Sequence, residues 1–228
     1  MDSDRLTVLT RKFPVQVLNK NRKWFHEETE WQKRSYLFRG DTLERNEESM
    51  FVKVCGLRTV EQIDKAIEYG YDAIGIVTYH KSKRYSPPEE AARLAAYAKG
   101  KIATFVVGLQ YSDVETVAPV FDYVQIYETR PIINLVLASK DMPPEGLDYR
   151  YFVYDASVGS GDFGPFPDWL KGLSEKLIVA GGLNADNVCT VIRELRPFGV
   201  DVSSGVEKEG VKDFRLMKEF IEAVRNCR

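Results

Sequence analysis

The sequence predicts an α/β fold: a barrel of eight parallel strands and intervening helices, preceded by an extension over residues 1–49. Two observations carry this prediction. From residue 51 onward, eight short runs are apolar nearly throughout, as expected for parallel strands buried on both faces. Amphipathic patterns separate several of these runs, and strands that alternate with helices indicate a (β/α)8 barrel. The chain of 228 residues is long enough for one such barrel.

The expected strands are short and bounded by polar or glycine-containing segments. They lie at 51–55, 72–77, 104–109, 122–127, 132–138, 149–155, 176–182 and 199–205. The expected helices carry apolar residues on one face, which is the pattern of a helix that packs against a sheet. They lie at 60–69, 88–98, 184–195 and 212–224.

The connections between the fourth and sixth strands are unusually short. Only residues 128–131 separate the fourth strand from the fifth, and about ten residues, two of them prolines, separate the fifth from the sixth. A crossover with a full helix needs at least about a dozen residues. Either these helices are reduced to turns, or the strand count is wrong by one.

Residues 1–49 differ in composition and pattern from the predicted barrel over residues 50–228. The extension is rich in charged and aromatic residues and shows no repeating pattern. Residues 14–18 could form a short strand. Residues 24–38 predict a helix, because three aromatic residues are spaced by seven, and Arg39-Gly40 would end it. The aromatic residues of this helix are Trp24, Trp31 and Phe38.

Two roles for the extension stay open. Its aromatic side chains could cover the part of the barrel wall that the shortened connections leave bare. Alternatively, residues 1–49 could be a disordered or partner-binding tail.

The composition narrows the classes of partner. A net charge of −2 points to neither nucleic acid nor a membrane surface, so any anion site must be built locally. No run of about 18 apolar residues predicts a membrane-spanning helix, and the first residues lack the order of a secretory signal. Three cysteines are too few and too irregularly spaced for a disulfide framework or a zinc site. A reduced cytoplasm fits best.

Glycine-containing loops follow the last two expected strands. Gly181-Gly182 follows the seventh, and Ser203-Ser204-Gly205 follows the eighth. Barrels often bind phosphate between these two loops through backbone N–H groups, and glycine permits the close backbone approach. The glycines could instead serve only to make turns. Two such loops at these two strands favour a phosphate site.

A thiol and a carboxyl group end two of the expected strands. Cys55 ends the first strand and could accept a proton if a nearby positive charge stabilised its thiolate, although a free cysteine is often only a small buried hydrophobe. Asp155 closes the sixth strand. It could donate a proton if partly desolvated, or it could hydrogen-bond to the loop that contains Gly159 and Gly161.

Two further charged residues lie near the same end of the barrel. Arg84 follows the second strand, where its guanidinium could pair bidentately with a carboxylate. On spacing alone, however, a solvated basic loop is the more frequent outcome. Asp201, on the eighth strand, faces the mouth or the interior of the barrel and could hold a loop in place.

Four motifs together identify a resemblance. They are KVCG at 53–56, SKRY at 82–85, AGGLN at 180–184 and VDVSSGVE at 200–207. At these residues the chain resembles the phosphoribosylanthranilate isomerase family of tryptophan biosynthesis. The resemblance implies an aldose–ketose isomerase that performs an Amadori rearrangement without metal or cofactor. The expected partner is a phosphorylated small molecule rather than nucleic acid or membrane, and the enzyme would be a monomer or a homodimer.

The resemblance also implies roles for the residues. Asp155 would be the general acid that opens the ribose ring, and Cys55 the general base that removes the proton from C2′. Arg84 would bind the anthranilate carboxylate. We expect the substrate-binding set to comprise Arg84, Gly159, Gly161, Gly181, Gly182, Asp201, Ser203, Ser204 and Gly205.

Some positions depart from the family pattern. The family usually closes the fourth strand with VQLHG, whereas this chain has VQIYE at 124–128. The family's third strand usually continues into a phenylalanine–asparagine pattern, whereas this chain has QYS at 110–112. A noncatalytic relative that binds a phosphosugar or a protein is therefore an alternative, although such a binder would need neither Cys55 nor Asp155. An isomerase of another aminoaldose phosphate is a second alternative. The corresponding barrel of the histidine pathway usually has an aspartate base, so Cys55 favours the tryptophan pathway.

Overall fold

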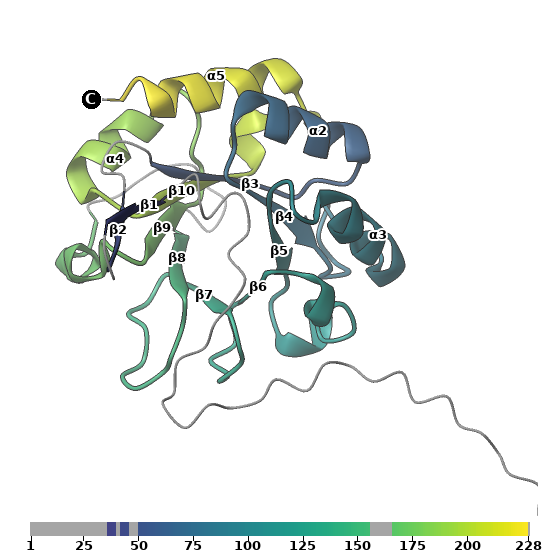
Figure 1. Ribbon diagram of the computed structural model, residues 1–228, viewed down its shortest axis with the longest axis horizontal. Helices are drawn as coiled ribbons and strands as arrows, with labels where there is room; N and C mark the ends of the chain where they lie inside the picture. The colour runs from purple at the N-terminus through teal and green to yellow at the C-terminus, as the bar shows by residue number, and fades with distance from the viewer. Residues whose placement is uncertain (1–35, 40–41, 46–49, 156–165, 228) are drawn as a thin grey trace, which may run out of the picture.

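Eight parallel strands close into a barrel in the computed structural model, which describes residues 36–39, 42–45, 50–155 and 166–227 (Figure 1). Each strand pairs with the next along the chain, and the last pairs with the first. The strands are β3 (Phe51–Cys55), β4 (Ala73–Val77), β5 (Ala103–Val107), β6 (Tyr123–Ile126), β7 (Leu135–Ser139), β8 (Tyr151–Asp155), β9 (Leu177–Ala180) and β10 (Gly199–Val202). The predicted barrel and its strand count are confirmed.

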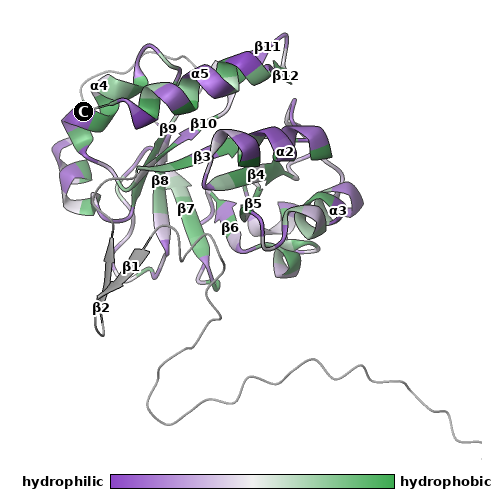
Figure 2. Ribbon diagram, turned by 45° about the horizontal axis from the view of Figure 1, so that its top comes forward, coloured by the Kyte–Doolittle hydropathy of each residue, from purple (hydrophilic) through white to green (hydrophobic). Residues whose placement is uncertain are grey.

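Four α-helices lie outside the barrel in the described part of the chain: α2 (Val60–Tyr69), α3 (Pro88–Ala98), α4 (Val188–Leu195) and α5 (Phe214–Arg225). Local signals set their ends. The Thr59 side chain accepts a hydrogen bond from the Gln62 N–H at the start of α2, and Gly70 ends that helix with a φ of 86°. Hydrophobic and hydrophilic residues alternate along α2 and α5 (Figure 2), because one face of each helix packs inward.

The remaining connections are short helical turns or loops. The 3-10 helices η1 (Tyr111–Asp113) and η2 (Ala118–Val120) connect β5 to β6, and η3 (Asp168–Leu173) precedes β9. No helix forms in the described connections from β6 to β7 and from β7 to β8. Both are loops, as the prediction of shortened connections allowed. After β10, η4 (Ser204–Val206) leads into a hairpin of β11 (Glu207–Lys208) and β12 (Val211–Lys212).

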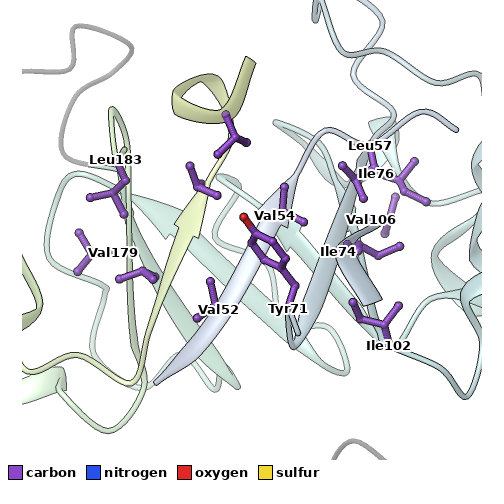
Figure 3. Packing of buried hydrophobic residues seen from close by; sticks show 14 of the residues in the cluster. Val52, Val54, Leu57, Tyr71, Ile74, Ile76, Ile102, Val106, Val179 and Leu183 are labelled. Carbon is purple, nitrogen blue, oxygen red and sulfur yellow. The ribbon is translucent and has the colours of Figure 1, made fainter. Parts of the chain in front are cut away.

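Side chains fill two buried layers because they alternate across each strand. An outer layer lies between strands and helices, and Figure 3 shows Val52 and Val54 there beside Tyr71. An inner layer of mostly aromatic and small residues, such as Phe105 and Tyr151, fills the barrel. The barrel is thus a packed core, and ligand chemistry is confined to its mouth.

Aromatic rings from the barrel's own loops cover part of the wall that lacks helices. The ring of Phe152, on β8, lies 6.1 Å from that of Tyr149 and 5.9 Å from that of Trp169, measured between centroids. Trp169 also makes an edge contact with Tyr154 at 5.8 Å. These contacts help to bury the outward face of β8.

The helix predicted over 24–38 is wrong at its end. Tyr36–Arg39 is strand β1, paired antiparallel with β2 (Thr42–Arg45), and residues 24–35 and 14–18 lie outside the described part. The two residues between the strands are Gly40-Asp41, a dipeptide that favours a two-residue hairpin as well as a helix stop. The aromatic spacing of seven outweighed this hairpin signal in the prediction.

Most other elements differ from prediction by one to four residues at an end, and three of these boundaries matter for the site. Helix α4 begins at Val188 rather than residue 184, because the Asn184 Oδ1 accepts hydrogen bonds from the N–H groups of Asp186 and Asn187 in a turn that precedes it. Strand β7 begins at Leu135, after Asn134 with its φ of 57°. Strand β10 ends at Val202. None of the described helices has the length and apolarity that a membrane crossing requires.

Candidate active site at the barrel mouth

Cys55 and Lys53 lie on the same interior face of β3, since they are two residues apart in a strand. Both are buried. Their heads converge beside Gly75 of the neighbouring strand: a Cβ atom at Gly75 would lie 2.7 Å from the Cys55 Sγ and 3.1 Å from the Lys53 Nζ. Any larger residue at position 75 would therefore displace the thiol.

Burial raises the pKa of the Cys55 thiol, and the positive charge of Lys53 opposes this shift. The charge of Lys212 also lowers the pKa of Cys55, whereas the negative charge of Asp201 raises it, as burial does. The thiol is therefore mainly neutral in the ligand-free protein near neutral pH. Its readiness to accept a proton depends on the charges around it.

Lys53 forms a buried ion pair with Asp201 across the β3–β10 seam. The two residues are partners in the strand register, and the Lys53 Nζ lies 2.6 Å from the Asp201 Oδ2. Burial alone would lower the pKa of Lys53, but Asp201 and Cys55 together hold it above its usual value. The lysine therefore remains charged inside the barrel.

Asp155 lies at the end of β8, with Tyr127 beside it after β6. The Tyr127 hydroxyl donates a hydrogen bond to the Asp155 Oδ2 at 3.1 Å. Burial raises the pKa of Tyr127, and the negative charges of Asp155 and Cys55 raise it further, so the hydroxyl stays protonated. Cys55 ends β3, Tyr127 follows the end of β6 and Asp155 ends β8, so all three residues lie at one mouth of the barrel.

Arg84 is held by a partner that the sequence reasoning did not identify. Its Nε and Nη2 donate to the two carboxylate oxygens of Glu207, each at 2.7 Å. The Lys212 Nζ donates to the Glu207 Oε1 at 2.6 Å. The arginine side chain packs over Gly56, where a Cβ atom would lie 2.3 Å from the Arg84 Cδ. Arg84 therefore lies directly beside the residue that follows Cys55.

The two glycine-containing loops after β9 and β10 touch each other. Gly181 and Gly182 have φ values of 86° and 68°, a region that glycine occupies without strain. A Cβ atom at Gly205 would lie 1.8 Å from the Leu183 carbonyl oxygen. Ser203, at the start of the second loop, donates from its Oγ to the Cys55 carbonyl oxygen at 3.0 Å. The second loop is thereby tied both to the first loop and to β3.

Three interior-facing side chains near the carboxyl ends of β6, β8 and β10 each keep one buried oxygen without a hydrogen bond within the described structure. These atoms are the Gln125 Oε1, the Asp155 Oδ1 and the Asp201 Oδ1. A buried polar atom without a partner costs about 1–3 kcal/mol. A ligand that brings hydroxyl or amine groups to the mouth would satisfy them.

The structure brings most of the predicted site residues to one end of the barrel. Gly159 and Gly161 lie outside the described residues, so their expected role stays a prediction. The sequence reasoning missed Lys53, Glu207 and Lys212. Lys53 had a local signal, since it is a charged residue within an apolar strand, two positions before Cys55. The other two had no local signal. The described residues contain no cluster of three side chains that could hold a metal ion.

Comparisons with known proteins point to one family. The family model described as N-(5'-phosphoribosyl)anthranilate (PRA) isomerase matches residues 150–223. An N-(5'-phosphoribosyl)anthranilate isomerase from Streptococcus pneumoniae (strain ATCC BAA-255 / R6) is 38% identical over 196 residues, which cover 77% of this chain and 96% of that protein.

Solved structures agree with this result. The phosphoribosyl anthranilate isomerase from Thermotoga maritima has a TM-score of 0.65 and 31% identity over 78% of this chain and 99% of its own. A second isomerase structure is a complex with reduced 1-(o-carboxyphenylamino)-1-deoxyribulose 5-phosphate. It has a TM-score of 0.62 and 30% identity over 78% of this chain and 99% of its own.

Proposed function

We propose that this chain, which belongs to the N-(5'-phosphoribosyl)anthranilate isomerase family, catalyses the Amadori rearrangement of N-(5'-phosphoribosyl)anthranilate to 1-(2-carboxyphenylamino)-1-deoxyribulose 5-phosphate in tryptophan biosynthesis. Cys55 at the end of β3 and Asp155 at the end of β8, which share one barrel mouth, carry this proposal. The reaction needs an acid and a base on the same substrate, and these two groups can supply them. We assign the activity to residues 50–228.

The ligand of the solved relative has four kinds of group, as its chemical name states: a carboxylate, an aromatic amine, sugar hydroxyls and a phosphate. The candidate site offers a binding partner for each charged or polar group of such a ligand. Arg84 suits the carboxylate, the loops at Gly181-Gly182 and Ser203–Gly205 suit the phosphate, and the unpartnered oxygens suit the hydroxyls and the amine. This match supports the same ligand chemistry here.

In the first step Asp155 donates its proton to the furanose ring oxygen. The C1′–O bond breaks, and the nitrogen lone pair forms a C=N bond, which gives a protonated Schiff base. The Tyr127 hydroxyl holds the Asp155 Oδ2, so the other oxygen, Oδ1, is the one free to face the substrate. A positioned general acid typically accelerates such a step by about 10²–10⁴-fold.

In the second step the Cys55 thiolate takes the proton from C2′. The electron pair of the C2′–H bond forms a C1′=C2′ double bond, and the electron pair of the C=N double bond returns to the nitrogen. The product is a neutral enol-amine. The enol-amine then tautomerises to the ketone. The iminium is the electron sink, so a base of modest strength is sufficient, and the thiolate form of Cys55 meets that need.

Arg84 binds the anthranilate carboxylate in this proposal. A guanidinium has five N–H donors in a planar fork, and Glu207 engages the Nε and Nη2 groups. The Nη1 hydrogens remain to reach a second carboxylate. Glu207 thereby fixes the plane of the guanidinium before substrate arrives, which lowers the entropy lost on binding.

The test is an assay of the loss of anthranilate-type fluorescence on N-(5'-phosphoribosyl)anthranilate. Cys55→Ser and Asp155→Asn should each lower kcat by at least about 10²-fold. Cys189→Ser and Asp168→Asn, which change the same residue types on α4 and η3, should retain activity. Inactive wild type would reject the proposed function, and full activity in Asp155→Asn would reject the proposed acid.

A further inference from the structure

We propose that Lys53, anchored by Asp201, is a positioning residue that stabilises the thiolate of Cys55 as it takes up its proton. The inference deepens the proposed function and rests on the role of Cys55 as general base. Neither the strand motif nor the family resemblance assigned a role to this lysine.

The geometry brings the ammonium group and the sulfur to the same space beside Gly75. Lys53 and Cys55 share the interior face of β3, and both heads lie within about van der Waals distance of the point where a Gly75 Cβ would stand: 3.1 Å for Nζ and 2.7 Å for Sγ. Glycine at position 75 leaves the space in which the two groups meet.

Asp201 keeps the lysine charged and in place. The Nζ–Oδ2 distance of 2.6 Å and the direct register pairing of the two residues hold the ammonium at the β3–β10 seam. The side chain of Lys53 also passes over the Phe105 ring, with its Nζ 5.3 Å from the ring centroid. These contacts leave the fully buried lysine little freedom to turn away from Cys55.

A purely structural role explains the pair less well. Replacing a buried ion pair with well-packed apolar residues is often neutral or stabilising, and the barrel interior below the mouth is mostly apolar, as at Phe105, Val153 and Ile178. The pair is found at the level of the thiol instead. Among the described residues the Asp201 Oδ1 also has no hydrogen-bond partner, so the pair leaves one of its own acceptor atoms unsatisfied.

Other charged or titratable groups also face the thiol. They are Asp201 on β10, Lys212 on β12, Arg84 after β4, and Tyr127 after β6, with Asp155 on β8 beyond it. Arg84 and Lys212 both bind Glu207, which offsets much of their charge. Among the neighbouring charges, Lys53 lowers the pKa of Cys55 most.

The test measures ionisation of Cys55 without turnover. The full-length protein is treated with iodoacetamide from pH 6 to 10, and the alkylation rate of Cys55 is read by peptide mass spectrometry, which separates it from Cys189 and Cys227. Lys53→Met should raise the midpoint of the alkylation-rate profile by one pH unit or more. At a pH below that midpoint, the fraction of Cys55 present as thiolate would then be about tenfold lower than in wild type. Ile178→Val, another interior change without a charge, should leave the midpoint unchanged.

An unchanged midpoint in folded Lys53→Met would overturn the proposal. Should that variant fail to fold, as judged by circular dichroism, Lys53→Gln decides: its amide keeps an N–H donor for Asp201 but carries no positive charge, so the midpoint should again rise. An unchanged or lower midpoint would then reject the role of Lys53. Wild-type turnover is assayed separately, so failure of the proposed function is distinguished from failure of this inference.

Discussion

Arg84 and Glu207, which are 123 residues apart in sequence, form a bidentate ion pair beside the barrel mouth. Both hydrogen bonds are 2.7 Å long, and the Glu207 side chain is 7% exposed. Since Lys212 donates to the same carboxylate, Glu207 organises two of the cations nearest to the proposed substrate site.

Removing the charge of Glu207 should therefore weaken substrate binding. In Glu207→Gln the guanidinium loses one of its two oxygen partners and its fixed plane. We expect KM to rise and kcat/KM to fall about tenfold, which corresponds to about 1.4 kcal/mol of binding. Steady-state kinetics on N-(5'-phosphoribosyl)anthranilate measure this. Glu209→Gln, on the exposed turn of the same hairpin, serves as control, and equal kinetics in both variants would contradict the prediction.

The same carboxylate should make stability sensitive to acid. Burial alone would raise the pKa of Glu207, but hydrogen bonds from Arg84 and Lys212 lower it below its usual value. A carboxyl group with a depressed folded-state pKa contributes stability above its unfolded pKa of about 4.3, and that contribution is lost as the pH falls through the folded pKa. Glu207→Gln should therefore lose less stability than wild type between pH 6 and pH 3. Urea unfolding at several pH values checks this, and parallel losses in the two proteins would refute it.

Loss of the Tyr127 hydroxyl should slow ring opening. Tyr127→Phe removes the 3.1 Å hydrogen bond that orients Asp155, and a net hydrogen bond is worth about 1 kcal/mol, or about fivefold in rate. We expect kcat to fall by about threefold to tenfold with little change in the melting temperature. Tyr149→Phe, whose ring packs against Phe152 on the outer wall, is the matched control. Unchanged kcat in Tyr127→Phe would show that the hydroxyl does not orient the acid.

A methyl group at position 205 should disrupt the phosphate loops. In Gly205→Ala the new Cβ would lie 1.8 Å from the Leu183 carbonyl oxygen, so the loops after β9 and β10 must separate. Overpacking of this kind typically costs about 1–3 kcal/mol, and KM should rise because the proposed phosphate site comprises both loops. Gly172→Ala, where a Cβ would meet nothing within 4 Å, should be neutral in melting temperature and KM. Wild-type KM in Gly205→Ala would place the phosphate elsewhere.

Local sequence signals were sufficient for most of the secondary structure. The apolar runs predicted all eight strands, and the ranges 60–69 and 88–98 matched α2 and α3. These elements are set by periodicity and by caps such as Thr59, which act over a few residues. Errors arose where two local signals competed, as at residues 36–38, and where a side chain such as Asn184 formed a turn ahead of its helix.

The sequence by itself determined which residues could act at the barrel mouth, because strand order and the alternation of side chains place Cys55 and Asp155 at the carboxyl ends of interior strands. Only the tertiary structure decided their partners. Lys53 meets Asp201, and Arg84 meets Glu207, because closing the barrel brings β10 against β3 in one particular register. Such contacts span more than 100 residues and depend on the position of every intervening strand, so no local pattern encodes them.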